Sequence, residues 1–261
     1  MNERYELLEK IAEGGRGVVH RARDRDTGRE VAFKRLNAHI AATELQREVR
    51  ALTAIRHPGV VELLDSGMDE TSGFLVLELL TGETLDARAS RAALTLAEFH
   101  ALAEQSLAAL NAVHSAGFIH RDVKPENLVS AEFGVSTAEW RLLDFGLAVP
   151  LGEAAVGAAV GSVHFMAPEQ FAGGPVDERT DMYALGCTLY FALSGRFPFD
   201  GETSAQVITA HLYLDPAALE AVPPAIAGWV GRLMRRRREE RPADARECAR
   251  LLGEAMLASL E

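Results

Sequence analysis

The sequence His-Arg-Asp-Val-Lys-Pro-Glu-Asn at residues 120–127, followed by Asp-Phe-Gly at residues 144–146, carries most of the chemistry that this chain offers. The carboxylate of Asp122 can accept or orient the proton of a substrate hydroxyl. The ammonium of Lys124 can neutralise charge on a phosphoryl group during its transfer. The two segments therefore predict a site for phosphoryl transfer, and the rest of the chain is interpreted outward from them.

Further charged and amide groups fit the same chemistry. Asn127 and Asp144 offer hard oxygen ligands of the kind that Mg²⁺ prefers. Lys34 ends the strand-like run Val-Ala-Phe-Lys, where a solvated ammonium would be ordinary. Glu48 lies on the next helical segment, where it can pair with Lys34 and direct that ammonium at phosphates. We therefore expect these four side chains to converge on one site.

A glycine-rich segment, Ala-Glu-Gly-Gly-Arg-Gly-Val-Val, occupies residues 12–19 between two strand-like runs. Glycines allow backbone N–H groups to approach phosphate oxygens closely. Alone the motif is weak, because a hairpin turn without a ligand also uses glycines. Ala12 stands at the first glycine position, which excludes a strict dinucleotide fingerprint, and no Gly-Lys-Ser/Thr follows as in an ATPase phosphate loop.

The chain changes character near Gly82. Before it, alternating or β-branched runs and one helical run predict a small β-rich lobe. After it, Ala- and Leu-rich segments such as Leu96–Ala116 predict a larger helical lobe, with Glu78–Thr81 as the connector and a ligand cleft between the lobes. The predicted strands are Tyr5–Glu13, Gly17–Asp24, Arg29–Leu36, Val60–Asp65, Phe74–Leu80 and Trp140–Leu143, and the predicted N-terminal helix is Thr43–Ile55.

Composition narrows the class of protein. The 261 residues are 48% apolar and 25% charged, which is typical of a globular chain. No apolar run reaches eighteen residues and the N-terminus is acidic, so we expect no membrane segment, and a cytoplasmic location. Cys187 and Cys248 are expected to be buried thiols. The net charge of −11 argues against nucleic acid or an anionic membrane as a general partner, and Arg235–Arg238 is expected to be a solvated helix face.

With Ala-Pro-Glu at residues 167–169, the ordered set of motifs resembles the eukaryotic-like protein kinase superfamily over nearly the whole chain, and its Ala and Arg content favours a bacterial member. The resemblance implies an α+β, bilobal kinase fold in one domain, residues 1–261. The N-lobe, 1–79, would be a small antiparallel sheet with one regulatory helix. A hinge at about 78–82 would lead to a mainly helical C-lobe, 83–261.

The resemblance also assigns roles. Lys34 would bind the α- and β-phosphates, Glu48 would hold Lys34, and Asp122 would be the catalytic base. Lys124 would contact the γ-phosphate, and Asn127 and Asp144 would bind Mg²⁺, with Mn²⁺ as a substitute. Leu52, Leu63, Phe145 and His120 would form a hydrophobic spine, Asp181 would hold the catalytic loop, and Arg241 would pair with Glu169. The residues placed around ATP are Ala12, Glu13, Gly14, Gly15, Gly17, Val19, Ala32, Lys34, Leu77 as gatekeeper, Glu78, Leu80 and Val129.

The same resemblance bears on the acceptor. Lys124, two residues after the catalytic aspartate, is the serine/threonine kinase pattern, and Ser162 matches the hydroxyl residue that contacts Asp122 and Lys124 in such enzymes. Residues 161–170 supply a platform for a protein substrate, which small-molecule kinases of this fold commonly lack. A nucleotide-binding pseudokinase or scaffold is the other alternative, because Ala12 departs from the motif.

Regulation is the least determined feature. Residues 147–161 contain no Ser, Thr or Tyr that could be phosphorylated. Arg121 is nevertheless present, and in the family an arginine at this position normally binds a phosphate group on that loop. We expect the loop to be held by Glu153 or by apolar packing, or the domain to be activated by a partner protein. The chain is also compatible with being one module of a longer polypeptide, and residues 130–139 with a surface insertion.

Overall fold

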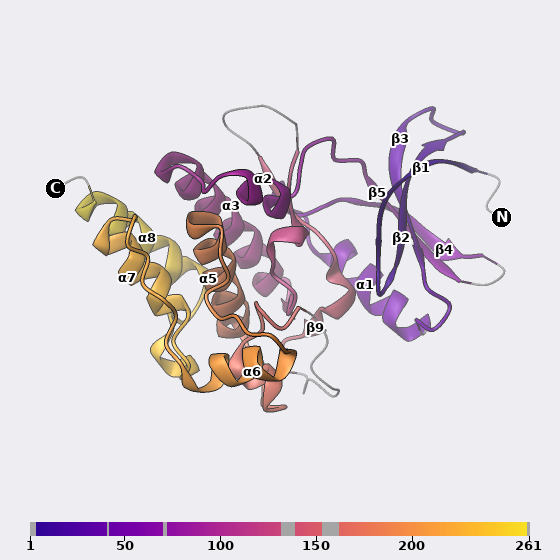
Figure 1. Cartoon of the computed structure of the whole chain (residues 1–261). Coiled ribbons are helices and arrows are strands. Elements are labelled where there is room, and N and C mark those ends of the chain that lie inside the picture. Colours follow the sequence, from indigo (N-terminus) through magenta and orange to yellow (C-terminus); the bar gives the residue numbers. More distant parts are fainter. Residues whose placement is uncertain (1–3, 41, 70–71, 132–138, 153–161, 260–261) are drawn as a thin grey trace.

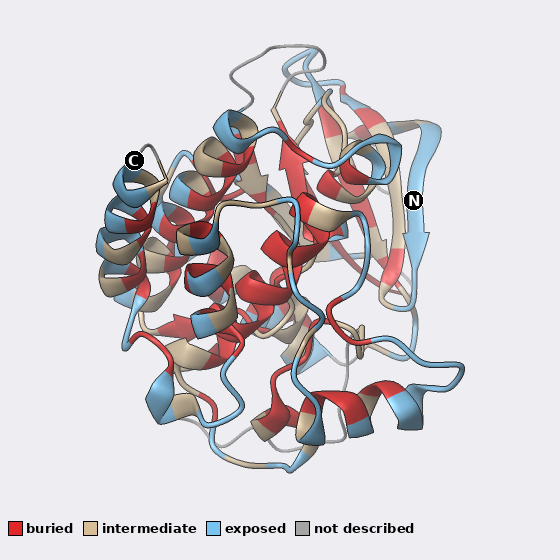
Figure 2. Cartoon of the chain, turned by 60° about the vertical axis from the view of Figure 1, so that its left-hand side comes forward, coloured by how far each residue is buried: buried red, intermediate tan, exposed pale blue. Residues whose placement is uncertain are grey.

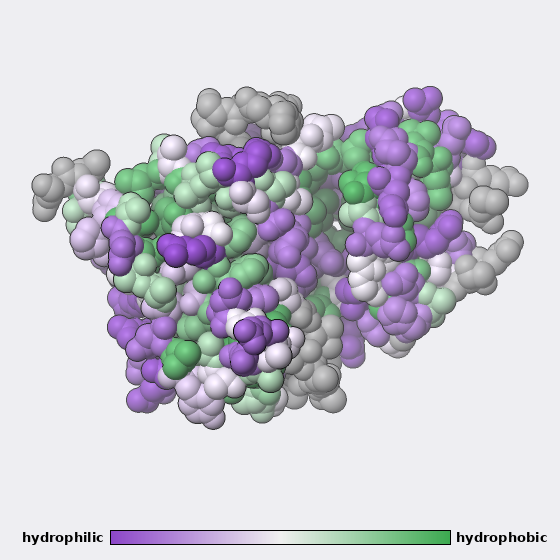
Figure 3. Space-filling model, viewed as in Figure 1, coloured by the Kyte–Doolittle hydropathy of each residue, from purple (hydrophilic) through white to green (hydrophobic). Residues whose placement is uncertain are grey.

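The computed structural model describes residues 4–40, 42–69, 72–131, 139–152 and 162–259. Figure 1 shows two lobes, with a sheet and one helix on one side and a bundle of helices on the other. The predicted α+β, bilobal architecture is therefore confirmed. The surface is hollowed where the two lobes meet (Figure 3).

The N-lobe is built on a five-stranded antiparallel sheet with the order β1-β2-β3-β5-β4. Its strands are β1 (Tyr5–Gly14), β2 (Gly17–Asp24), β3 (Glu30–Leu36), β4 (Leu63–Met68) and β5 (Gly73–Glu78). The predicted strand Val60–Asp65 is wrong at both ends. Val60 and Val61 are buried in the main core and pair with Leu142 of the other lobe, so these β-branched residues serve the lobe junction and β4 starts later.

Strand register places the residues of interest on one face of this sheet. Ala12 pairs with Val19, and Val19 pairs with Lys34. Ala32 lies two residues before Lys34 and pairs with Leu77. Because directly paired residues and residues two apart point to the same side, all five side chains share one face.

The helix α1 (Ala42–Ala54) packs on that face. Leu45 joins Leu36 and Leu75 in a small apolar cluster, and Leu52 enters the main core. Glu48 stands in the same buried stripe, with only 1% of its surface exposed. A carboxylate so deeply buried needs a cationic partner, and Lys34 lies on the strand face against which the helix packs.

The C-lobe is helical. Its helices are α2 (Leu85–Arg91), α3 (Leu96–Ser115), α4 (Pro168–Phe171), α5 (Glu178–Ser194), α6 (Ser204–Tyr213), α7 (Pro224–Leu233) and α8 (Ala245–Ala258). Four short strands complete it: β6 (Phe118–Ile119), β7 (Leu128–Ser130), β8 (Trp140–Leu142) and β9 (Val149–Pro150). Every residue of α5 from 180 to 193 is buried, so this helix lies in the core of the lobe. Figure 2 shows buried residues in the interior of the molecule and exposed residues on its outer surface. Asp177 caps its first turn, and Gly195 ends it in the left-handed conformation.

Two smaller predictions have different outcomes. Cys187 and Cys248 are free, buried thiols, as predicted. The run Arg235–Arg238 is not a helix face, because α7 ends at Leu233 and the run continues into a 3₁₀ turn at 238–240. Three of its arginines pair with carboxylates: Arg236 with Asp215 at 3.3 Å, Arg237 with Glu239 at 2.8 Å and Arg238 with Asp177 at 3.4 Å.

Buried His211 makes the stability of this lobe depend on pH. It is fully buried and shares a 2.8 Å hydrogen bond with the Tyr183 hydroxyl. Burial, assisted by the nearby charge of His164, lowers the pKa of His211 from 6.5 to about 4. The unfolded chain therefore takes up this proton first as pH falls, so the stability that neutral His211 contributes is complete above pH 6.5 and is lost between about pH 6.5 and 4.

We expect the unfolding free energy to fall by about 2 kcal/mol more in the wild type than in His211→Gln between pH 7.5 and pH 5.0. Urea unfolding at both pH values measures this, and each variant is its own reference. The exposed His39, changed to Gln, is the control and should keep the wild-type difference. An unchanged difference in His211→Gln would contradict the assignment.

Candidate active site

Lys34 lies at the centre of one charged cluster. Its Nζ is 2.8 Å from Glu48 Oε1 and 2.7 Å from Asp144 Oδ1, which joins the sheet, α1 and the Asp-Phe-Gly segment. Burial alone lowers the pKa of Lys34, but the charges of Asp144 and Glu48 outweigh burial and raise it overall. Burial likewise raises the pKa of Asp144, but Lys34 outweighs this, so the pKa is lowered well below its usual range. Lys34 and Glu48 are almost fully buried and the Asp144 side chain is 30% exposed, so the cluster meets solvent mainly at Asp144.

The conformation of Asp144 turns its carboxylate toward Lys34. Asp144 has a φ of 56°, in the left-handed region that residues other than glycine seldom adopt. Its side chain accepts a 3.3 Å hydrogen bond from the Gly146 N–H. The next residue, Phe145, is buried in the main core and contacts the His120 ring edge-on at 4.7 Å. Core packing of Phe145 therefore offsets the strain at Asp144.

The spine residues named from the sequence come together around Phe145. Leu52 and Phe145 belong to one buried cluster, and Leu63 packs against it. His120 is fully buried and its Nε2 lies 2.9 Å from the Leu143 carbonyl. The contacts run from α1 and β4 into the loop that precedes Asp122.

A second polar cluster surrounds Asp122. Its Oδ2 accepts hydrogen bonds from Lys124 Nζ at 2.8 Å and from Asn127 Nδ2 at 3.0 Å. Among the described residues, the other carboxylate oxygen of Asp122 and the Oδ1 of Asn127 have no hydrogen-bond partner. The N–H of Leu143 donates to the Asn127 carbonyl at 2.8 Å, which ties this loop to the segment that carries Asp144.

Asp181 on α5 holds the loop that carries Asp122 by hydrogen bonds to its backbone. Its carboxylate accepts from the backbone N–H groups of His120, at 2.9 Å, and Arg121, at 2.8 Å, and lies 2.8 Å from His114 Nε2. Burial raises its pKa, but the hydrogen bond and charge of His114 and the other donors outweigh burial and lower it. Arg121 has a φ of 68°, so the loop is strained at this point. The part played by His114 was missed from the sequence, since a single histidine in a long helix carries no signal.

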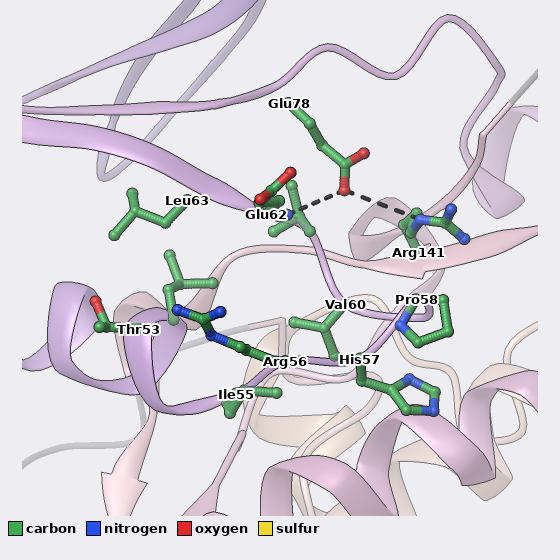
Figure 4. A pocket seen from close by; sticks show the side chains of 12 residues that line it. Thr53, Ile55, Arg56, His57, Pro58, Val60, Glu62, Leu63, Glu78 and Arg141 are labelled. Carbon is green, nitrogen blue, oxygen red and sulfur yellow. Dashed lines mark hydrogen bonds and ion pairs between the residues drawn. The ribbon is translucent and has the colours of Figure 1, made fainter.

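The lobe connection offers backbone groups to a ligand. The Glu78 N–H donates to the Glu62 carbonyl, and the Glu78 carboxylate accepts from the Glu62 N–H, both at 3.0 Å. Figure 4 shows that carboxylate turned into a cavity of about 430 Å³, toward Arg141 at 3.9 Å. The backbone and the side chain of Glu78 therefore both tie the connection to Glu62. Leu80 has no backbone hydrogen bond within the described ranges, so its N–H and C=O are both available.

The glycine-rich turn divides into open and structural positions. Gly14 and Gly15 are exposed, and a Cβ at either would meet nothing within 4 Å. At Gly17 a Cβ would lie 2.2 Å from the Arg35 carbonyl oxygen, so the close approach of β2 to β3 requires a glycine there. The Glu13 side chain is exposed and pairs with Lys10 at 2.7 Å, away from the polar clusters.

The apolar residues named for adenine lie on both sides of the lobe junction. Val19, Ala32 and Leu77 share the sheet face that carries Lys34. Val129 is buried in β7 and forms a bridge with Thr84, just after the connection. A flat ring entering beside the connection would meet the sheet on one side and β7 on the other.

The structure does not join Ser162 to the catalytic loop. Ser162 is half-buried, and in the described part of the chain no hydrogen bond links its hydroxyl to Asp122 or Lys124. Its predicted contact stays a prediction. Glu153, with the rest of residues 153–161, and most of the predicted insertion, 132–138, lie outside the described residues.

A buried ion pair anchors the segment after Ser162. Arg241 makes two bonds to the Glu169 carboxylate, at 2.7 and 2.9 Å, and lies 4.7 Å from the centre of the Tyr183 ring. Its side chain also donates to the backbone carbonyls of Arg179, Arg235 and Arg236. This pair was named from the sequence, and its geometry fits a bracing role rather than chemistry.

We expect Arg241→Met to lower the free energy of unfolding by about 3 kcal/mol, because it leaves the largely buried Glu169 carboxylate, 11% exposed, without its cation. Urea unfolding with α-helical circular dichroism measures this. Arg237→Met is the control: its 70% exposed side chain pairs only at the surface, so a change within about 0.5 kcal/mol is expected. Equal losses in both variants would contradict the bracing role.

Comparisons with known proteins agree with this geometry. The family described as "Protein kinase domain" matches residues 5–250. The DNA damage-responsive serine/threonine-protein kinase RqkA of Deinococcus radiodurans is 39% identical over 95% of this chain, and the serine/threonine-protein kinases pkn2 of Myxococcus xanthus and PknB of Mycobacterium tuberculosis are 32% and 34% identical over 98% and 86%. The aligned regions cover 39%, 33% and 37% of those relatives, so the chain spans little more than a third of their length. The chain therefore belongs to the protein kinase family, as a catalytic domain of the eukaryotic-like serine/threonine type found in bacteria.

Proposed function

We propose that this domain transfers the γ-phosphate of Mg-ATP to serine or threonine hydroxyls of proteins. The observation that carries the proposal is the convergence of two polar clusters, Lys34–Glu48–Asp144 and Asp122–Lys124–Asn127, which the Leu143–Asn127 hydrogen bond joins at the lobe junction. Members of this family use ATP and a divalent metal ion. A metal between the clusters would supply charge neutralisation of the phosphates.

The donor set fits Mg²⁺. Asp144 keeps one carboxylate oxygen free of partners in the described residues while the other holds Lys34 and the Gly146 N–H. Asn127 points its amide nitrogen at Asp122, which leaves its Oδ1 free. One carboxylate and one amide oxygen, with water and phosphate completing the shell, are typical of Mg²⁺, and Mn²⁺ would be accepted by the same oxygens.

The protein side chains divide the remaining work. Lys34, held by Glu48, binds the inner phosphates. Asp122 orients the acceptor hydroxyl with its free oxygen and takes its proton, while Lys124, 2.8 Å from the other oxygen, balances the charge of the transferred group. The exposed Gly14 and Gly15 cover the phosphates with backbone N–H groups. The Glu78 carbonyl and Leu80 fix the adenine between Val19, Ala32, Leu77 and Val129.

Serine or threonine acceptors are favoured by the family comparisons and by Lys124, and a protein substrate by the segment up to Gln170. Gln170 donates to the Arg121 carbonyl at 3.3 Å, so the platform is fastened to the catalytic loop. An activating partner protein and a cytoplasmic location are part of the proposal: ATP is abundant there, and both thiols of the chain are free. No helix in the described ranges has the length and apolarity to span a membrane.

The test is phosphate transfer from γ-labelled ATP to a mixture of basic and acidic proteins, with aminoglycosides and sugars in parallel. We expect label in phosphoserine and phosphothreonine of the proteins, lost with EDTA and restored by excess Mg²⁺. Label only in small molecules would identify a small-molecule kinase. Tight ATP binding without transfer to any acceptor would instead identify a pseudokinase.

A further inference from the structure

Arg16, at the tip of the β1–β2 turn, reaches from the glycine-rich segment to the Asp-Phe-Gly segment. A Cβ built on Gly146 would lie 2.2 Å from its Nε, so the guanidinium rests directly on that residue. Its Nη2 lies 3.2 Å from Glu44 Oε2 at the start of α1. Asn37 holds the turn in place. Its side-chain amide donates to the Gly15 carbonyl at 2.9 Å, and its backbone N–H donates to the Arg16 carbonyl at 3.0 Å.

Two nitrogen atoms of this guanidinium are buried without a hydrogen-bond acceptor in the described part of the chain. The side chain of Arg16 is 19% exposed, yet Nε and Nη2 are shielded from solvent and have no hydrogen-bond partner among the described residues. The Glu44 contact has the distance of an ion pair without the alignment of a hydrogen bond. Buried N–H groups of an arginine are normally satisfied by an acceptor, so an acceptor is expected beside Gly146.

The position beside Gly146 identifies that acceptor. Asp144, two residues earlier in the chain, is the metal ligand of the proposed function. A divalent ion on Asp144 would repel a bare guanidinium, and anionic oxygens between the two cations remove that repulsion. In phosphoryl-transfer sites the metal bridges β- and γ-phosphate oxygens, so those are the oxygens that Arg16 would meet.

We propose that Arg16 is a further phosphate-binding residue, which closes the glycine-rich turn over the β- and γ-phosphates of the nucleotide while Glu44 positions its guanidinium. This inference rests on the proposed function. The opposite possibility, that Arg16 obstructs an empty site and must leave before ATP enters, uses the same contacts and predicts an effect of opposite sign.

Calorimetric titration of ATP, ADP and adenosine, each with Mg²⁺, distinguishes the two. Arg16→Met keeps an unbranched apolar stem and removes the charge and the N–H donors. Arg16→Lys keeps a positive charge but lacks the planar, forked guanidinium. Arg23→Met is the matched control, because Arg23 lies on the same hairpin, is 54% exposed and only meets Glu30 at 3.8 Å. Circular dichroism of each variant confirms folding.

We expect Arg16→Met to weaken ATP binding about tenfold, ADP binding less, and adenosine binding not at all, with Arg16→Lys between and Arg23→Met unchanged. Unchanged ATP binding, equal losses for all three ligands, or tighter ATP binding would overturn this inference alone. If the wild-type chain bound no ATP in the presence of Mg²⁺, the proposed function would fall and this inference with it.

Discussion

Asp122→Asn will reduce kcat for protein phosphorylation about 10³-fold while the affinity for Mg-ATP stays within about twofold. The Asp122 carboxylate has one oxygen held by Lys124 and Asn127 and one oxygen free, which is the arrangement of a base that waits for a hydroxyl. An amide keeps the size of the side chain but can neither take the proton nor balance Lys124, and a positioned base contributes roughly 10²–10⁴ in rate. Single-turnover transfer from γ-labelled ATP and calorimetric ATP titration measure the two quantities separately.

Asp215→Asn is the matched control, because Asp215 is 83% exposed and only pairs with Arg236 at the surface. Its rate should equal that of the wild type. Equal phosphorylation by Asp122→Asn and wild type would show that Asp122 is not the base. If the wild type and Asp122→Asn both bound ATP but transferred no phosphate, the result would favour the scaffold alternative instead.

The sheet face of the candidate site could be predicted because it depends on local rules. Alternation along β3 places Ala32 and Lys34 on one side, and antiparallel pairing extends that side to Val19 and Leu77. The catalytic loop was readable for a similar reason: Asp122, with two neighbours within five residues, forms its hydrogen bonds locally.

The errors arose where distant segments decide the outcome. Val60 and Val61 are β-branched residues typical of a strand, but they pack against the other lobe. The local sequence pattern does not indicate this long-range contact. The prediction of a helix face at Arg235–Arg238 was wrong because α7 ends at Leu233, before this run begins.

Arg16 was overlooked because its value depends on three separate elements. Its guanidinium meets Gly146 only because the β1–β2 turn, α1 and the Asp-Phe-Gly segment are brought together by folding. In the sequence it is one cation within a turn, and most such cations are solvated. The signal that could have found it is the pairing of a basic loop tip with an acidic first turn of the following helix, at Glu44.

Asp144→Asn will have the largest effect, a loss of kcat of about 10⁴-fold together with loss of the Mg²⁺ dependence of ATP binding. Asp144 is the carboxylate that holds both Lys34, at 2.7 Å, and the proposed metal, and its lowered pKa keeps it ionised at neutral pH. An amide removes a full negative charge from the metal site, where the ion's charge is most needed. Calorimetric titration of ATP with Mg²⁺ and with EDTA measures the metal contribution directly, and single-turnover transfer measures the rate.

Folding should survive this substitution, because Lys34 keeps Glu48 at 2.8 Å and the buried pair remains neutral. Lys34→Met is the informative contrast, since it leaves Glu48 and Asp144 as two uncompensated carboxylates and should lower stability as well as rate. An Asp144→Asn variant that kept the wild-type difference between Mg²⁺ and EDTA would place the metal on other ligands. Loss of the Mg²⁺ effect with unchanged melting temperature would localise the defect to the metal, because the fold depends on the Lys34–Glu48 pair and not on the charge of Asp144.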